Sequence, residues 1–97
     1  LKEYAEEGLS ILYKMGVNLV LVFSDFMKGR RFAEVPCSDR RLVEGSFLVA
    51  AAISEVCSMT EEIERRLWYM GKEILSAGLS VLSPDCLAPL QGIHTLL

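Results

Sequence analysis

The stretch from Ser58 to Cys86 reads SMTEEIERRLWYMGKEILSAGLSVLSPDC, and it decides the predicted fold. Its first four residues, Ser58 to Glu61, fit a capping box, in which two side chains satisfy the first backbone amides of a helix. Gly78 follows the helix at the position of a left-handed end, and a short apolar strand over Leu79–Leu82 comes next. The apolar helix positions recur at helical spacing and are Ile63, Leu67, Met70 and Ile74, with Trp68 and Leu75 widening the face.

The N-terminal part of the chain repeats this pattern. Residues 2–15 carry a helical stripe of apolar side chains, and Gly16 follows where a left-handed helix end is expected. The run Val17–Phe23 is rich in β-branched residues and almost wholly apolar, which is typical of a strand covered on both faces in a parallel sheet. Two such units predict an α/β protein with alternating helices and mostly parallel strands.

The segment between the two units is less regular. Residues 24–45 are largely polar and predict a long loop, which in a compact domain is often functional. The apolar run Phe47–Ile53 fits a buried strand, or the middle of a helix from about Ser38 to Cys57, because periodicity does not separate the two in so short a run. Three alanines favour the helix, whereas Gly45 and the restart at Ser58 favour the strand, which is the interpretation we adopt.

Length and composition limit the class of protein. The 97 residues make one small domain with a single core, and 52% apolar with 24% charged residues indicates a globular chain. A mean hydropathy of +0.34 is high for so short a chain, which favours a homo-oligomer or a subunit of a larger complex. The net charge of −3 argues against a nucleic-acid-binding face. No apolar run approaches the roughly 20 residues that span a bilayer, so no membrane partner is expected.

Residues 46–90 resemble the C-terminal end of the uroporphyrinogen decarboxylase superfamily, which includes the corrinoid-dependent methyltransferases. The matching pieces are Ala52-Ile53-Ser54 as a strand end, Thr60–Ile63 opening a helix, and Ala77–Cys86 ending in a Pro-Asp-Cys turn. The resemblance implies a (β/α)₈ barrel of roughly 250 residues, of which residues 1–97 form a C-terminal fragment, if they are not a single α/β domain.

The same resemblance implies that Cys86 is a zinc ligand and that the activity is methyl transfer from a corrinoid to a thiol. Leu87 stands where the family has glycine, and the chain holds no His-x-Cys pair. Zinc takes four ligands, or three from protein at a catalytic site, and none of the other candidates has the expected spacing. Those candidates are Cys37, Cys57, His94, Asp25 and Asp85.

The cysteines also admit simpler interpretations. Cys86 is either an unliganded cysteine or the nucleophile of a Cys–His pair with His94. Three cysteines without framework spacing favour free thiols in a reducing compartment, and hence a cytoplasmic location.

Charged and aromatic residues suggest two further sites. A basic cluster beside the expected loop suits an anion or carboxylate ligand, although nearby carboxylates nearly balance it and a solvated, paired loop is the alternative. Asp25 suits a ligand or acid–base role, or a turn. Trp68 and Tyr69 are consecutive on a helix, so only one fits deep in a small core and the other marks a partner surface. The basic cluster comprises Lys28, Arg30, Arg31, Arg40 and Arg41.

Two functions therefore stay open at the level of sequence. The first is a zinc-dependent methyltransferase, or a fragment of one, with Cys86 at its metal. The second is a non-catalytic α/β domain that acts as a homo-oligomer or as a subunit of a larger protein complex. The presence of bound zinc separates these two interpretations.

Overall fold

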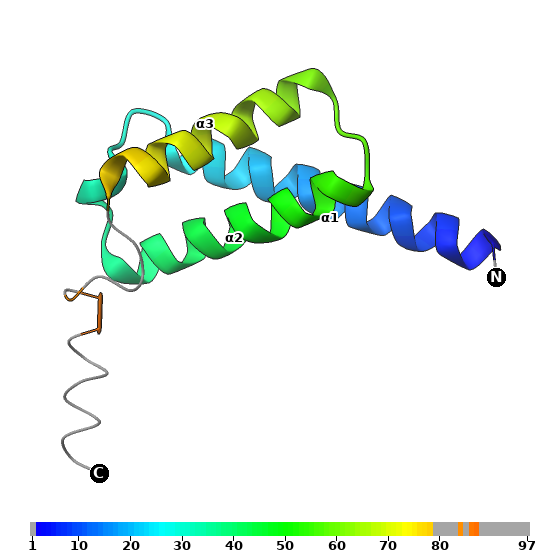
Figure 1. Cartoon of the computed structure of the whole chain (residues 1–97), viewed down its shortest axis with the longest axis horizontal. Helices are drawn as coiled ribbons and strands as arrows, with labels where there is room; N and C mark the ends of the chain where they lie inside the picture. Colours follow the sequence, from blue (N-terminus) through cyan, green and yellow to red (C-terminus); the bar gives the residue numbers. More distant parts are fainter. Residues whose placement is uncertain (1, 79–83, 85, 88–97) are drawn as a thin grey trace, which may run out of the picture.

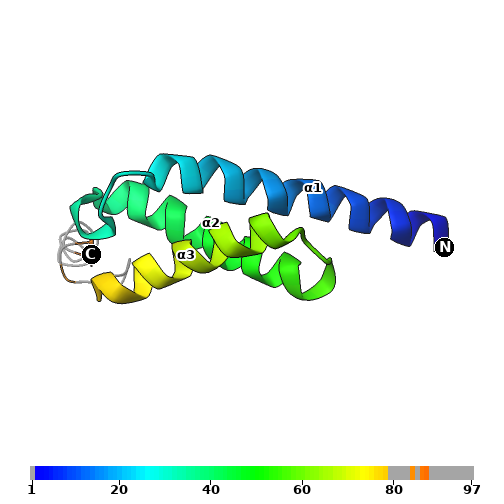
Figure 2. The same cartoon turned by 90° about the horizontal axis from the view of Figure 1, so that it is seen from above.

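A computed structural model describes residues 2–78, 84, 86 and 87 of the chain. This part holds three α-helices, α1 (Lys2–Met27), α2 (Cys37–Val56) and α3 (Glu61–Ala77), and a 3₁₀ turn, η1 (Phe32–Glu34). Consecutive helices run antiparallel, and the N-terminal part of α1 extends beyond the other two (Figure 1). Figure 2 shows the same bundle from above, with α2 and α3 crossing on one side of α1, which contacts both of them.

The predicted α/β fold is wrong, because the residues that the structure describes contain helices and no strand. The interpretation as a (β/α)₈ barrel fragment is wrong for the same reason. The predicted strand Val17–Phe23 is the middle of α1. Val20 is fully buried while Val22 is 60% exposed, so the run is covered along one helical stripe rather than on two faces.

Gly16 lies inside α1 and does not end a helix. It is buried, and a Cβ atom at this position would lie 2.9 Å from Ile53 Cγ2 and 2.7 Å from Met59 Cε. Because glycine has no side chain, Ile53 of α2 and Met59 of the following turn rest directly on the backbone of α1. The glycine is needed for close packing between helices. In a short stretch of sequence, a glycine with that role cannot be distinguished from a glycine that ends a helix.

The predicted long loop over residues 24–45 is shorter than expected, since α2 begins at Cys37. The run Phe47–Ile53 lies within α2, so the helix alternative is confirmed and the strand is wrong. The buried side chains of this helix recur every three to seven residues, at Val43, Ala50 and Ile53, which is helical periodicity. Phe32 of η1 is fully buried and its backbone N–H donates to Glu73 Oε1 at 3.2 Å, which fixes the connection on α3.

Helix α3 follows the sequence prediction closely, except that Trp68 and Leu75, which were expected to widen its buried face, are exposed because they lie beside the stripe rather than on it. All four stripe residues, Ile63, Leu67, Met70 and Ile74, are buried, and Gly78 ends the helix with a φ of +62°. The helix begins two residues later than the capping box predicted, because Thr60 is the N-cap and its Oγ1 accepts from the Ile63 N–H at 3.4 Å. The predicted strand Leu79–Leu82 lies outside the described residues.

By length and composition, α1 is able to cross a membrane. An 18-residue window of α1 has a mean hydropathy of 1.4, and only 11% of that window is buried in the bundle. Core helices and signal sequences meet the same two criteria. The expectation that the chain has no membrane partner stays a prediction.

The close approach at Gly16 predicts a difference between two glycine substitutions. Gly45→Ala on α2 meets no heavy atom within 4 Å, so it should stabilise the protein by about 0.5–1 kcal/mol through helix propensity. Gly16→Ala gains the same propensity but crowds Ile53 and Met59, and overpacking of this kind costs about 1–3 kcal/mol. Urea unfolding followed by circular dichroism should therefore rank Gly16→Ala below Gly45→Ala. Equal stabilisation at both positions would contradict the α1–α2 contact described above.

Candidate protein-interaction groove

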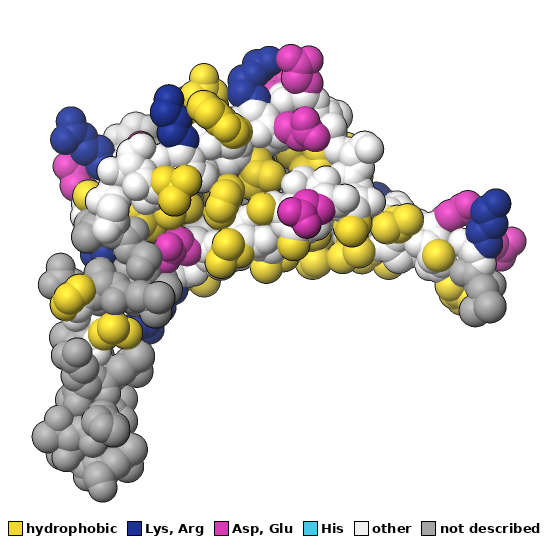
Figure 3. Space-filling view, viewed as in Figure 1, with side chains coloured by type: hydrophobic (Ala, Val, Ile, Leu, Met, Phe, Trp, Pro, Cys, Tyr) yellow, Lys and Arg dark blue, Asp and Glu magenta, His cyan; other side chains and the backbone are white. Residues whose placement is uncertain are grey.

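A groove runs between α2 and α3 and has a volume of about 520 Å³. Its walls are largely apolar, and its polar lining groups are Ser54, Ser76, Glu64 and Lys72. The apolar lining residues are Phe47 and Ala51 from α2, and Leu67, Trp68, Gly71 and Leu75 from α3. Figure 3 shows hydrophobic side chains gathered along this length of the two helices.

The floor of the groove depends on Gly71. A Cβ atom at this buried position would lie 2.7 Å from Phe47 Cζ, so the ring lies directly on the backbone of α3. The glycine therefore lets a ring from α2 lie between the helices without separating them. Phe47 and Gly71 are 24 residues apart in sequence, and only the antiparallel pairing of α2 with α3 brings them together.

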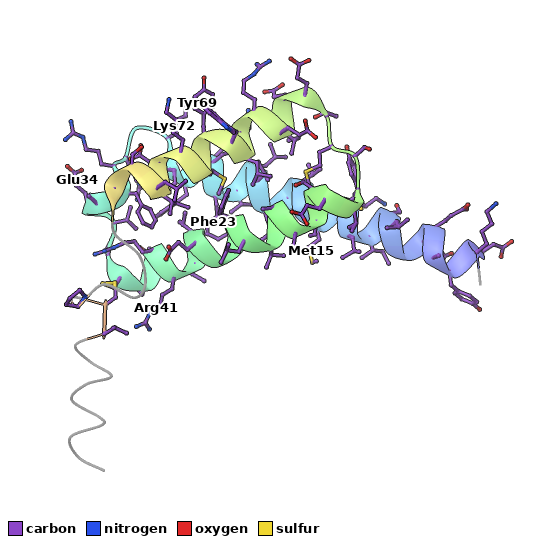
Figure 4. All side chains as sticks on the ribbon, viewed as in Figure 1. Met15, Phe23, Glu34, Arg41, Tyr69 and Lys72 are labelled. Carbon is purple, nitrogen blue, oxygen red and sulfur yellow. A yellow bond between two sulfur atoms is a disulfide. The ribbon has the colours of Figure 1, made fainter. Side chains whose placement is uncertain are left out.

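The rim of the groove exposes large apolar side chains. Trp68 is 62% exposed and Leu75 is 83% exposed. The Lys72 ammonium lies 5.2 Å from the centroid of the Trp68 ring, and the Tyr69 ring meets Trp68 edge-on at 5.6 Å between centroids. Figure 4 shows Tyr69 and Lys72 projecting from α3 on the side away from α2. Lys72 lines the outer rim of the groove, whereas Tyr69 lies outside the groove, on the side of α3 that faces α1.

The groove has opposite charges near its two ends. Glu64 stands at the N-terminal end of its α3 wall, and Lys72 stands two turns further along the same helix. The Ser54 hydroxyl donates to the Ala51 carbonyl at 2.7 Å, so it is held by its own helix rather than aimed into the groove. An apolar trough with one acid and one base at its rim is suited to binding an apolar chain and orienting it.

The structure separates the predicted basic cluster. The Arg30 guanidinium lies over the Phe26 ring at 4.5 Å, and the buried Arg40 donates from Nε to the Val35 carbonyl at 2.8 Å. Arg41 Nη2 donates to the Cys86 carbonyl at 2.8 Å. These three side chains serve different parts of the fold, so they do not form the predicted anion site. Lys28 and Arg31 are exposed.

Asp25 lies at the surface and pairs with α3. Its Oδ1 is 3.3 Å from Arg66 Nη1, and Arg66 Nη2 is 3.3 Å from Glu62 Oε1. The Asp25 side chain is 71% exposed, so this ion pair contributes little to stability. The structure thus gives Asp25 a helix-to-helix contact, and none of the main pockets in the described part of the chain includes Asp25 in its lining.

The expectation of free thiols is wrong for two of the three cysteines. Cys37 at the start of α2 and Cys86 form a disulfide, which Figure 4 shows beside Arg41. Cys57 is free and buried, and its thiol donates to the Leu9 carbonyl at 3.6 Å. Disulfides persist mainly in oxidising compartments, whereas the expected cytoplasmic location stays a prediction.

A disulfide sulfur has no thiolate with which to bind a metal, so a zinc site at Cys86 requires the reduced chain. No group of three or more His, Cys, Asp or Glu side chains suited to a metal ion occurs among the described residues. Of the other candidate ligands, Cys37 is in the disulfide and Cys57 is buried, and Asp25 pairs with Arg66. His94 and Asp85 lie outside the described part of the chain. Zinc at Cys86 stays a prediction, and elemental analysis of reduced protein against a Cys86→Ser variant tests it.

The sequence matches no family model, no curated protein and no solved structure. The resemblance of residues 46–90 to the decarboxylase and methyltransferase superfamily is therefore supported by no comparison.

The pairing of Cys37 with Cys86 predicts the number of thiols that react with a maleimide. Protein that is denatured without reductant should take one label per chain, at Cys57, and three labels after reduction. A Cys86→Ser variant is the matched control and should take two labels without reductant, because Cys37 is then free. Intact mass spectrometry counts the labels, and three labels on unreduced wild-type protein would contradict the disulfide.

Proposed function

We propose that this chain is a non-catalytic helical assembly module, and that its α2–α3 groove binds an apolar helix of a partner protein. The observation that carries the proposal is the exposure of Trp68 and Leu75 at the rim of an apolar groove. Tryptophan is enriched among the residues that dominate binding energy at protein interfaces. Large apolar side chains gathered on one groove mark an interaction site more often than single exposed ones do.

The dimensions of the groove support a helical ligand. Its α3 wall extends from Glu64 to Ser76, a rise of roughly 18 Å, which matches about three turns of a bound helix. A helix in such a groove contributes apolar anchors at positions i, i+3 or i+4, and i+7. A basic residue near one end of the ligand and an acidic residue near the other would pair with Glu64 and Lys72 and set its direction.

A zinc-dependent methyl transfer stays the alternative prediction for the reduced chain, and it depends on Cys86 rather than on the groove. The two activities use separate residues. A test of the groove therefore leaves the zinc prediction unaffected.

Trp68 makes the groove directly observable, because it is the only tryptophan in the chain. Titration with a synthetic amphipathic helix, with leucines at i, i+4 and i+7 and opposite charges at its ends, should shift the Trp68 emission to shorter wavelength. The physical reason is that the indole leaves water when the peptide covers it. The shift should saturate with peptide concentration.

Two variants at exposed leucines make the comparison. Leu75→Glu places a charge on the groove and should weaken the peptide response at least tenfold, whereas Leu42→Glu, at a 58% exposed site outside the groove, should leave it unchanged. Both sites are exposed, so neither substitution should alter the fold. An unshifted Trp68 emission, or equal weakening by both variants, would overturn the groove as the binding site.

A further inference from the structure

The outward side of α1 carries a second apolar stripe that the bundle does not use. Tyr4, Ile11 and Val22 are 77%, 66% and 60% exposed, and Met15 is 43% exposed. Their spacing of seven, four and seven residues is that of a coiled-coil seam. They lie on the side of α1 opposite Gly16 and Val20, the two residues that α1 buries in the bundle.

This stripe, hereafter the α1 seam, is slightly hollowed. A shallow depression of about 490 Å³ is lined by Met15, Asn18, Leu19, Val22 and Phe23, all from α1. Figure 4 labels Met15 and Phe23, which bound it along the helix. Asn18 is exposed in the middle of the seam. A single polar residue among apolar seam positions is a known means of setting the register of paired helices.

The two ends of α1 carry opposite charges. Residues 2–8 hold one lysine and three glutamates, a net charge of −2. Residues 28–31, directly after the helix, hold three basic residues and no acidic one, a net charge of +3. Glu7 and Lys28 are both exposed, and among the described residues neither forms an ion pair within the chain. A partner helix with the same charges in reverse direction would satisfy both ends.

We propose that two copies of this chain pair in antiparallel orientation along the α1 seam. The heptad spacing sets the register, in which Ile11 lies against Val22 of the second copy and Met15 lies against Asn18 of the second copy. In this register Glu7 of each copy flanks Lys28 of the other. This inference rests on the proposed role in assembly and names one partner, a second copy of the chain.

Two observations favour a second copy over a lipid surface. In this register the two Asn18 side chains lie three residues, about one turn, apart along the seam, where their amides can hydrogen-bond to each other, whereas hydrocarbon offers an amide no partner. The charge reversal between the ends of α1 gives specificity only toward an antiparallel helix with the same polarity. A parallel pair would instead place like charges together at each end.

The first measurement is the solution mass, by sedimentation equilibrium over a range of protein concentrations. Wild-type protein should form a concentration-dependent dimer, and Ile11→Glu should be monomeric, because it places a charge in each half of the seam. Leu75→Glu is the matched control and should dimerise like wild type, since it alters the α2–α3 groove alone. Circular dichroism confirms that each variant keeps its helix content.

Charge reversal tests the register independently. Glu7→Lys and Lys28→Glu should each weaken the dimer roughly five- to thirty-fold, because each reversal turns two attractive pairs of the dimer into repulsive ones. The double variant Glu7→Lys/Lys28→Glu should restore the wild-type affinity, as the pairs form again with their signs exchanged. Failure of the double variant to restore it would overturn the antiparallel arrangement.

Other results separate this inference from the proposed function. A monomer at all concentrations, or loss of the dimer in Leu75→Glu but not in Ile11→Glu, overturns the α1 seam. Binding of monomers to phosphatidylcholine vesicles that Ile11→Glu abolishes overturns it in favour of a lipid surface. If the dimer forms as expected but the Trp68 emission does not respond to the helical peptide, the groove proposal is wrong and the α1 seam is unaffected.

Discussion

The contact of Gly16 with Ile53 and Met59 is the constraint on which the rest of this bundle depends. Gly16 and Val20 are the buried residues of α1, and partly buried side chains beside them, among them Leu12, Val17 and Phe23, also pack against the core. The missing Cβ at Gly16 lets this side of α1 pack densely on Ile53 and Met59. The opposite side of the helix stays outside the core, and the α1 seam lies there. The side of α1 that packs on α2 through Gly16 thus also determines which side of α1 stays exposed.

The same glycine explains why much of the fold could not be predicted from the sequence. A glycine followed by seven mostly apolar residues is compatible with two structures. One is a helix end followed by a buried strand, and the other is a single helix that packs closely on a neighbour. Only the longer repeat of Gly16, Val20, Phe23 and Met27 separates the two, and it extends into a segment that polarity had assigned to a loop. Helix α3 was predictable because its apolar stripe spans about three turns between a clear cap and Gly78.

The groove was only partly predictable. Consecutive Trp68 and Tyr69 indicated that one of them lies outside the core, and both are in fact exposed, at 62% and 58%. The α2 wall of the groove could not be predicted from the sequence, because Phe47 contributes to it only when residues 47–53 form a helix that runs antiparallel to α3. The pairing of Cys37 with Cys86 was equally hidden, since it spans a sequence separation of 49 with no spacing pattern. Contacts between distant segments depend on topology, and the topology was misjudged at Gly16.

The two proposed surfaces share no residue, and this separation has a consequence for binding strength. The groove belongs to α2 and α3, whereas the seam belongs to α1, so pairing of two copies along the seam would leave both grooves open. A dimer then presents two identical grooves in a fixed antiparallel relation. A partner with two apolar helices would bind the second groove as an intramolecular step, at an effective concentration set by the linker between its helices. Weak binding by each groove would in that case be sufficient for a stable complex, and the chain concentration would control its formation.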